Sequence, residues 1–182
     1  MFASPFAKIS QKTEKKLTFS VFYLLLITIV VMRYFDTYLT NKITSNGIIS
    51  FELAKTLERS QEILDSWSPL AKVFAGLSLG FDFLFLLIYT LFISILIHNL
   101  NDRLWIGKYF YKIGGILIWT MFIAAVFDAI ENICLIKLLT GSLNQYWAHG
   151  AYYFALAKFL LISISLLYII SNFFILLFKK RL

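Results

Sequence analysis

Ionisable and amide side chains lie inside the apolar stretches of this sequence. Asp82 is in the second stretch, the trio Asp128, Glu131 and Asn132 is in the third, and Lys158 is in the fourth. Residues spaced i, i+3 and i+4 share one face of a helix, so the trio is expected to point the same way. Carboxyl groups beside a lysine can bind a polar or cationic ligand, relay protons, or act as acid and base.

Two polar stripes at helical spacing extend this pattern. One comprises Ser78, Asp82 and Tyr89, and the other Lys158, Ser165 and Asn172. Lipid cannot satisfy polar groups, so both stripes are expected to turn toward the interior of a bundle. The stripes would then bring the ionisable residues of different helices together at similar depths.

The acids outnumber the bases at this depth. Each charged residue near the centre of a span costs about 2.5–3.5 kcal/mol, so Asp82, Asp128 and Glu131 together cost roughly 8 kcal/mol. Lys158 can neutralise one carboxylate, and Arg33 is placed to pair with Asp36 at i, i+3. The remaining acids must be protonated, or must face water, a cation or a cationic ligand. A structural ion-pair network and a functional site both fit this pattern.

We therefore predict a polar pocket in the outer half of the bundle. Its candidate ligand-binding residues are Asp82, Asp128, Glu131, Asn132, Lys158 and Tyr89, with Asp36, Arg33 and Glu52 as secondary candidates. Whether it is an enzyme stays open; an enzyme would use Glu131 or Asp128 as its base. No cofactor or metal is expected, because His98 and His149 have no His or Cys partner at metal-ligand spacing. Both histidines are interpreted as interfacial residues.

The elements that carry these residues follow from composition. Of 182 residues, 60% are hydrophobic and 15% charged, whereas soluble domains carry about 25% charged residues. Apolar runs predict one all-α domain over residues 1–182, an integral membrane four-helix bundle. Its spans are expected at about 17–39, 70–99, 112–139 and 150–178. Ser68 and Pro69 are typical of a helix start, and Thr140-Gly141 of a helix end.

The only long segment between spans precedes the second one. Asn46-Gly47 is a turn signal, Ser50 can cap a helix, and Glu52 would then lie in its first turn. Apolar residues fall on one side of the stretch, which predicts an extra amphipathic helix over about 50–67. Two interpretations are open: a helix lying on the outer membrane surface, or a lid over the mouth of the bundle.

The distribution of the net charge of +7 gives an orientation. Basic residues precede the first span, lie near 100–112, and close the chain as Lys179, Lys180 and Arg181, whereas the stretch from Thr140 to His149 has none. The positive-inside rule then places both termini in the cytoplasm. Basic residues that flank spans in this way argue against a nucleic-acid partner.

Three segments carry a resemblance: Asn46-Gly47-Ile48-Ile49-Ser50-Phe51-Glu52-Leu53-Ala54, Phe81-Asp82-Phe83-Leu84-Phe85 and Asp128-Ala129-Ile130-Glu131-Asn132. Together they resemble a family of small, uncharacterised bacterial inner-membrane proteins with four spans. The resemblance covers most of the chain. It implies a multi-pass protein of the bacterial inner membrane, and it implies no activity.

Three functions remain open on these grounds. The leading hypothesis is a bundle that binds a small molecule or a lipid-like ligand. The second is a subunit of a proton- or cation-coupled transporter, which would need a homo-oligomer because four spans alone form a narrow pathway. The third is a non-catalytic partner of a larger membrane complex. Membrane lipids are the expected surroundings in each case.

Overall fold

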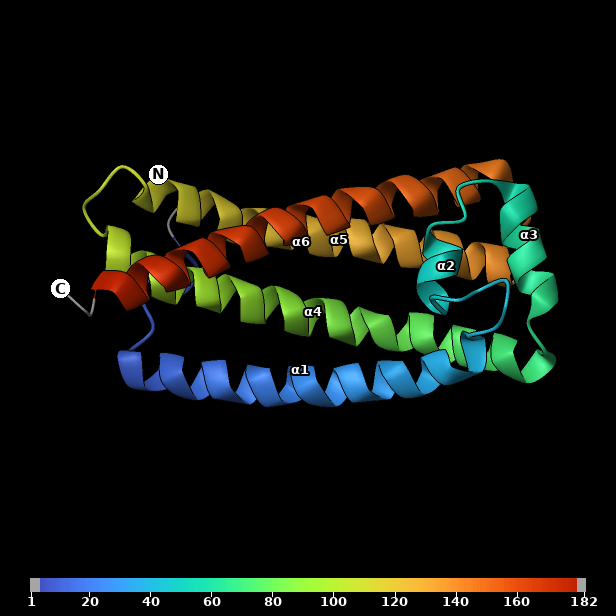
Figure 1. Cartoon of the computed structure of the whole chain (residues 1–182), viewed down its shortest axis with the longest axis horizontal. Coiled ribbons are helices and arrows are strands. Elements are labelled where there is room, and N and C mark those ends of the chain that lie inside the picture. The colour runs from blue at the N-terminus through green and yellow to red at the C-terminus, as the bar shows by residue number, and fades with distance from the viewer. Residues whose placement is uncertain (1–3, 180–182) are drawn as a thin grey trace.

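The chain forms a bundle of long helices, seen in a computed structural model that describes residues 4–179 (Figure 1). Four helices are long and apolar enough to cross a membrane: α1 (Gln11–Leu39), α4 (Pro69–Trp105), α5 (Tyr111–Leu139) and α6 (Gln145–Lys179). Two short helices, α2 (Ile48–Glu52) and α3 (Leu57–Ser66), lie between α1 and α4. The predicted all-α bundle with four spans is confirmed. Lys180 and Arg181 of the predicted basic C-terminus lie outside the described residues.

Local signals define the ends of the long helices. The Ser68 hydroxyl accepts a hydrogen bond from the Ala71 N–H at 3.2 Å, and Pro69 is the first residue of α4. At the end of α5, Gly141 takes a φ of +93° just beyond Thr140. Both predicted boundaries are therefore confirmed. The 37 residues of α4 extend over about 55 Å at 1.5 Å per residue, so this helix must tilt or project beyond a hydrocarbon core of about 30 Å.

The four long helices differ in how much surface they bury. α5 packs against both α4 and α6, whereas α1 packs along α4. Among the described residues, α1 and α6 form no extensive interface with one another. α1 buries only Val21, Thr28 and Leu39. α1 is therefore a peripheral helix, and one side of the bundle is left without direct packing between two long helices.

The segment between α1 and α4 differs from the single helix expected over 50–67. It forms α2 and α3, separated by a turn in which Lys55 has a φ of +64°. Gly47 rather than Ser50 precedes the first helix, and Thr56 caps the second by accepting from the Arg59 N–H. Phe51 and Glu52 are buried. The positive φ of Lys55 and the extended backbone of Thr56 interrupt the predicted single helix.

Tertiary contacts hold this segment over the end of the bundle. The Trp67 indole N–H donates to the Leu39 carbonyl at 3.0 Å, and its ring meets Phe51 edge-on. The Leu57 N–H donates to the Gln145 side chain at the start of α6, at 2.8 Å. The segment therefore packs against the end of the bundle, and the choice between a lid and a helix on the membrane surface stays a prediction.

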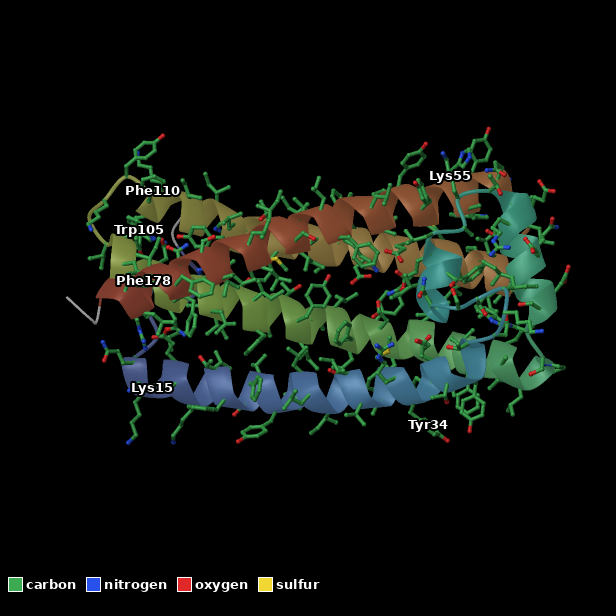
Figure 2. The ribbon with its side chains drawn as sticks, viewed as in Figure 1. Lys15, Tyr34, Lys55, Trp105, Phe110 and Phe178 are labelled. Carbon is green, nitrogen blue, oxygen red and sulfur yellow. The ribbon has the colours of Figure 1, made fainter. Side chains whose placement is uncertain are left out.

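The two ends of the bundle carry interfacial side chains. Figure 2 shows Lys15, Trp105 and Phe110 at the end that holds both termini, and Tyr34 and Lys55 toward the opposite end. Aromatic and basic residues favour the two membrane–water interfaces. We call the end with the termini the inner end and the end with α3 the outer end, following the orientation predicted from charge.

Candidate functional site

Lys158 is the centre of a buried cluster near the outer end. Its ammonium nitrogen Nζ lies 2.6 Å from Asp128 Oδ1, 2.7 Å from Glu131 Oε2 and 3.6 Å from Glu52 Oε2. All four side chains are buried, and they come from α2, α5 and α6. We call these four residues the acid–lysine cluster. Lys158 therefore meets three carboxyl groups, where the sequence suggested that it would neutralise one.

The two acids on α5 meet the lysine because they are one turn apart. Asp128, Glu131 and Asn132 are each no more than 2% exposed, which agrees with the shared face expected from their spacing. Asp128 uses both oxygens, since its Oδ2 accepts a hydrogen bond from the Tyr89 hydroxyl at 2.9 Å. Asp128 is thus fixed from two sides.

Asp82 belongs to a neighbouring pair. Its Oδ2 accepts a hydrogen bond from the Asn132 amide at 2.6 Å, and among the described residues it forms no ion pair with a lysine or arginine. Asn132 therefore orients Asp82 from the adjacent turn of α5. The structure thus brings together all six primary candidates: Lys158, Asp128, Glu131 and Tyr89 in one network, and Asp82 with Asn132 beside it.

Glu52 reaches the cluster because of a tight turn before α2. Gly47 adopts a φ of +56°, and a Cβ atom there would lie 1.8 Å from Asp36 Oδ1. That oxygen accepts a hydrogen bond from the Ile48 N–H at 2.8 Å. Arg33 is 3.6 Å from the other oxygen of Asp36, as its i, i+3 position suggested, although its side chain is 78% exposed. Asp36 and Gly47 thus fix α2, which in turn carries Glu52 inward.

The carboxyl groups around Lys158 outnumber the positive charges. Glu52, Asp82, Asp128 and Glu131 lie together, and Lys158 is the one cation among them in the described part of the chain. Four ionised carboxylates around one ammonium group would be very costly in a membrane interior. In addition, Glu131 Oε1 is buried without a hydrogen-bond partner among the described residues. Protons or an additional positive group must therefore offset the excess of acid.

A cavity of about 440 Å³ adjoins these residues. Its polar lining consists of Arg33, Asp36, Glu52, Asp82, Tyr89, Asp128 and Lys158. The apolar lining comes mainly from α1, α4 and α6: Leu25, Ile29, Met32, Phe85, Ile93, Phe159 and Ile162. Two of the predicted ligand-binding residues, Glu131 and Asn132, do not line the cavity. They lie behind its wall, where Glu131 contacts Lys158 and Asn132 donates a hydrogen bond to Asp82.

The cavity lies where α1 and α6 fail to pack together. Both helices contribute to its lining, and they form no extensive interface with each other in the described chain. A cavity with hydrocarbon walls and an acidic end can accommodate an amphiphile, with its head among the carboxyls and its chain along the apolar residues. Apolar pockets with a few convergent polar groups are the usual form of small-molecule sites.

His98, predicted as an interfacial residue, is buried within the protein toward the inner end of α4. It is 4% exposed, its ring lies 5.8 Å from that of Phe6, and its Nδ1 is 3.6 Å from Asp102 Oδ1. The N-terminal segment before α1 covers it, which the pattern of the helix alone could not indicate. Across residues 4–179, no group of three His, Cys, Asp or Glu side chains has an arrangement that could hold a metal ion.

Comparisons with protein-family models, with curated proteins and with solved structures give no match to this chain. Its function must therefore be argued from its own residues.

Proposed function

We propose that this integral membrane protein binds a lipid-like amphiphile whose head group carries a positive charge or donates hydrogen bonds. The observation behind the proposal is the cavity of about 440 Å³ with apolar walls and an acidic end. Its volume is within the range of about 300–1,000 Å³ typical of small-molecule sites. The proposal includes the bacterial inner membrane as the location, with both termini in the cytoplasm.

The acidic end supports a cationic or donating head group. Lys158 is already shared by three carboxyl groups. Asp82 lines the cavity and has an amide as its partner rather than a cation. A ligand ammonium beside Asp82 would supply the positive charge that the four acids lack. An anionic head group would instead add to the excess of negative charge, so we expect it to be rejected.

The apolar walls support a hydrocarbon chain. Ile29 on α1 and Ile162 on α6 both line the cavity, and these helices do not pack together along it. A chain can therefore enter sideways from the lipid without crossing the polar loops. Burial of a methylene group contributes about 0.8 kcal/mol relative to water, but relative to lipid the gain is small, so the head group must provide most of the selectivity.

Thermal unfolding in a non-ionic detergent tests this proposal with three probes of equal chain length: dodecylamine, dodecanol and dodecanoate. The amine should raise the unfolding midpoint most, because a ligand that binds only the folded state adds about 2.7 kcal/mol at one hundred times its dissociation constant. Asp82→Asn should reduce the shift caused by the amine and leave the smaller shift caused by the alcohol. Ile162→Trp, which fills the cavity, should reduce both shifts.

Asp65→Asn is the matched control, because Asp65 is exposed on α3 and lies outside the lining. It should respond to all three probes as the unmodified protein does. Equal shifts for the amine and the carboxylate, or an undiminished response in Ile162→Trp, would count against the proposal. The transporter and complex-partner hypotheses stay predictions; a stoichiometric companion that always copurifies would favour the latter.

A further inference from the structure

A line of buried hydroxyl and imidazole groups leads from the acid–lysine cluster toward the inner end. Thr90, Ser94 and His98 follow one another at intervals of four residues on α4, and Ser165 faces inward from α6. Each is no more than 4% exposed. None is used in the binding site described above, so their burial needs a separate explanation.

One polar atom of each of these four residues lacks a hydrogen-bond partner within residues 4–179, although His98 Nδ1 lies 3.6 Å from Asp102 Oδ1. Thr90 Oγ1, Ser94 Oγ, Ser165 Oγ and His98 Nδ1 are buried and have no hydrogen-bond partner among the described residues. Hydroxyls inside helices usually donate to a carbonyl of the preceding turn, as Thr120 does to the Leu117 carbonyl. These three hydroxyls do not, so they are available to groups outside their own helix. Buried polar groups left in this state are costly unless they meet water.

The register of α4 and α6 relates Ser165 to the three groups on α4. The Tyr168 hydroxyl bonds to Asn101, and the Trp105 indole bonds to Asn172. Both pairs differ by 67 in residue number, so the helices run in the same direction with a constant offset. The same offset places Ser165 level with His98, since 98 plus 67 is 165.

Distances along the helix axis suit bridging water molecules. Thr90 follows Tyr89, which bonds to the acid–lysine cluster through Asp128. From Thr90 to Ser94, and from Ser94 to His98, the rise is four residues, or about 6 Å. One water molecule making two hydrogen bonds of about 2.8 Å spans such a gap. The next group inward is Asp102, whose side chain is 40% exposed.

Polar groups at the outer mouth of the cavity continue this series of polar residues toward the outer side. Arg33 and Asp36 line the same cavity as Glu52 and Lys158, and the Arg33 side chain is largely exposed. Lys158 is matched by adjacent carboxylates, so its positive charge does not by itself repel an approaching proton. Polar residues therefore recur at successive levels from the outer mouth, through the cluster, to Asp102.

We propose that Thr90, Ser94, Ser165 and His98 form a water-bridged proton path between the acid–lysine cluster and the inner end. A hydroxyl can accept one proton while donating another, and neutral imidazole can do the same through its two nitrogens, so charge crosses without net change in either. This path does not depend on which ligand the cavity binds. Its two consequences are water along the path and proton movement through the protein.

Cysteine labelling tests for water. Ser94→Cys and Ser165→Cys are made in a Cys134→Ala background and treated in liposomes with a small hydrophilic methanethiosulfonate. Because the reagent attacks hydrated, ionised thiols, both should react at least about tenfold faster than a cysteine in dry core. Ile95→Cys on α4 is the control, since Ile95 is fully buried in the apolar core. Rates equal to that control would overturn the proposal.

Proton flux tests for conduction. Liposomes containing the full chain and a trapped pH dye are given a potassium diffusion potential, and acidification is compared with empty liposomes. Thr90→Val and Ser94→Ala remove the unpartnered hydroxyls, and each should lower the protein-dependent rate at least about fivefold by breaking the hydrogen-bonded chain. Thr28→Val is the matched control: Thr28 is buried on α1, and its hydroxyl already bonds to the Leu25 carbonyl. The absence of protein-dependent proton flux, or an equal loss of flux in the Thr28→Val control, would overturn the proton role even if the introduced cysteines react with the hydrophilic reagent.

Discussion

Removal of the Lys158 ammonium group should destabilise the bundle strongly. Contacts of 2.6 and 2.7 Å to Asp128 and Glu131 correspond to about 6 kcal/mol each at an effective dielectric constant near 20. Desolvation of the three ions offsets much of this attraction, and loss of one partner from a buried pair typically costs about 3–5 kcal/mol. We therefore expect Lys158→Met to lose about that much, because it keeps the volume of the side chain and leaves the acids without a cation.

The assay is thermal unfolding in mild detergent. For a chain of this size, 1 kcal/mol corresponds to about 2–4 °C, so the midpoint should fall by about 6–20 °C. Lys72→Met, at an exposed position of α4, should change it by no more than about 2 °C. If Asp128→Asn and Glu131→Gln are added to Lys158→Met, much of the loss should be recovered, because the two carboxyl groups closest to the lysine position are then neutral and only Glu52, at 3.6 Å, has lost a cation. A Lys158→Met midpoint within about 2 °C of the unmodified protein would refute this reasoning.

Two further predictions concern the turn before α2 and the orientation of the chain. Gly47→Ala should lower the free energy of unfolding by about 2–4 kcal/mol and expose α2 to limited proteolysis, because its Cβ would meet Asp36 at a positive φ. Gly80→Ala is the control: Gly80 has open space around it, so this variant should be neutral or slightly stabilising. Similar losses of stability in both variants would contradict the role of Gly47. Single cysteines replacing Tyr109 and Tyr146, both strongly exposed, should be labelled by an impermeant thiol reagent from opposite sides of the membrane. Tyr109→Cys should react from the cytoplasmic side and Tyr146→Cys from the other side. Labelling of both from one side would reject the predicted topology.

The sequence predicted the parts of this structure that depend on local periodicity. Apolar runs gave the four spans, because a bilayer requires helices of that length and composition. The spacing of Asp128, Glu131 and Asn132 predicted that they share one face, because the direction of each side chain around a helix depends only on residue spacing and not on the rest of the fold. Ser68 and Thr140 defined helix ends through hydrogen bonds that lie within a few residues of them.

Glu52 and His98 show where local reasoning fails. Glu52 was predicted as a secondary site candidate in the first turn of an amphipathic helix, but its contact with Lys158 depends on a turn at Gly47 packed on Asp36, which the pattern did not indicate. His98 was predicted as an interfacial residue, and its burial comes from Phe6, in the segment before α1, whose ring lies 5.8 Å from that of His98. In both cases the burial depends on a contact with a distant part of the chain. Periodicity within one helix carries no information about such contacts.

The composition of the acid–lysine cluster argues against a purely structural role. Asp128, Lys158 and Tyr89 already form a compact set in which both oxygens of the carboxylate have partners. Glu131 is fully buried with Oε1 unpartnered, and Glu52 lies only at 3.6 Å from the ammonium group. One carboxylate is enough to neutralise Lys158, so these two additional acids bring an excess of buried negative charge that a purely structural ion pair does not need.

Glu131→Gln separates the two roles. If the cluster only stabilises the fold, neutralising Glu131 should leave the unfolding midpoint unchanged or raise it slightly, with no other consequence. If the cluster serves the binding site and the proton path, the same variant should keep its unfolding midpoint within about 2 °C. It should nevertheless lose proton flux in liposomes and weaken the response to dodecylamine. A variant that keeps flux, amine response and stability together would leave Glu131 without a functional role.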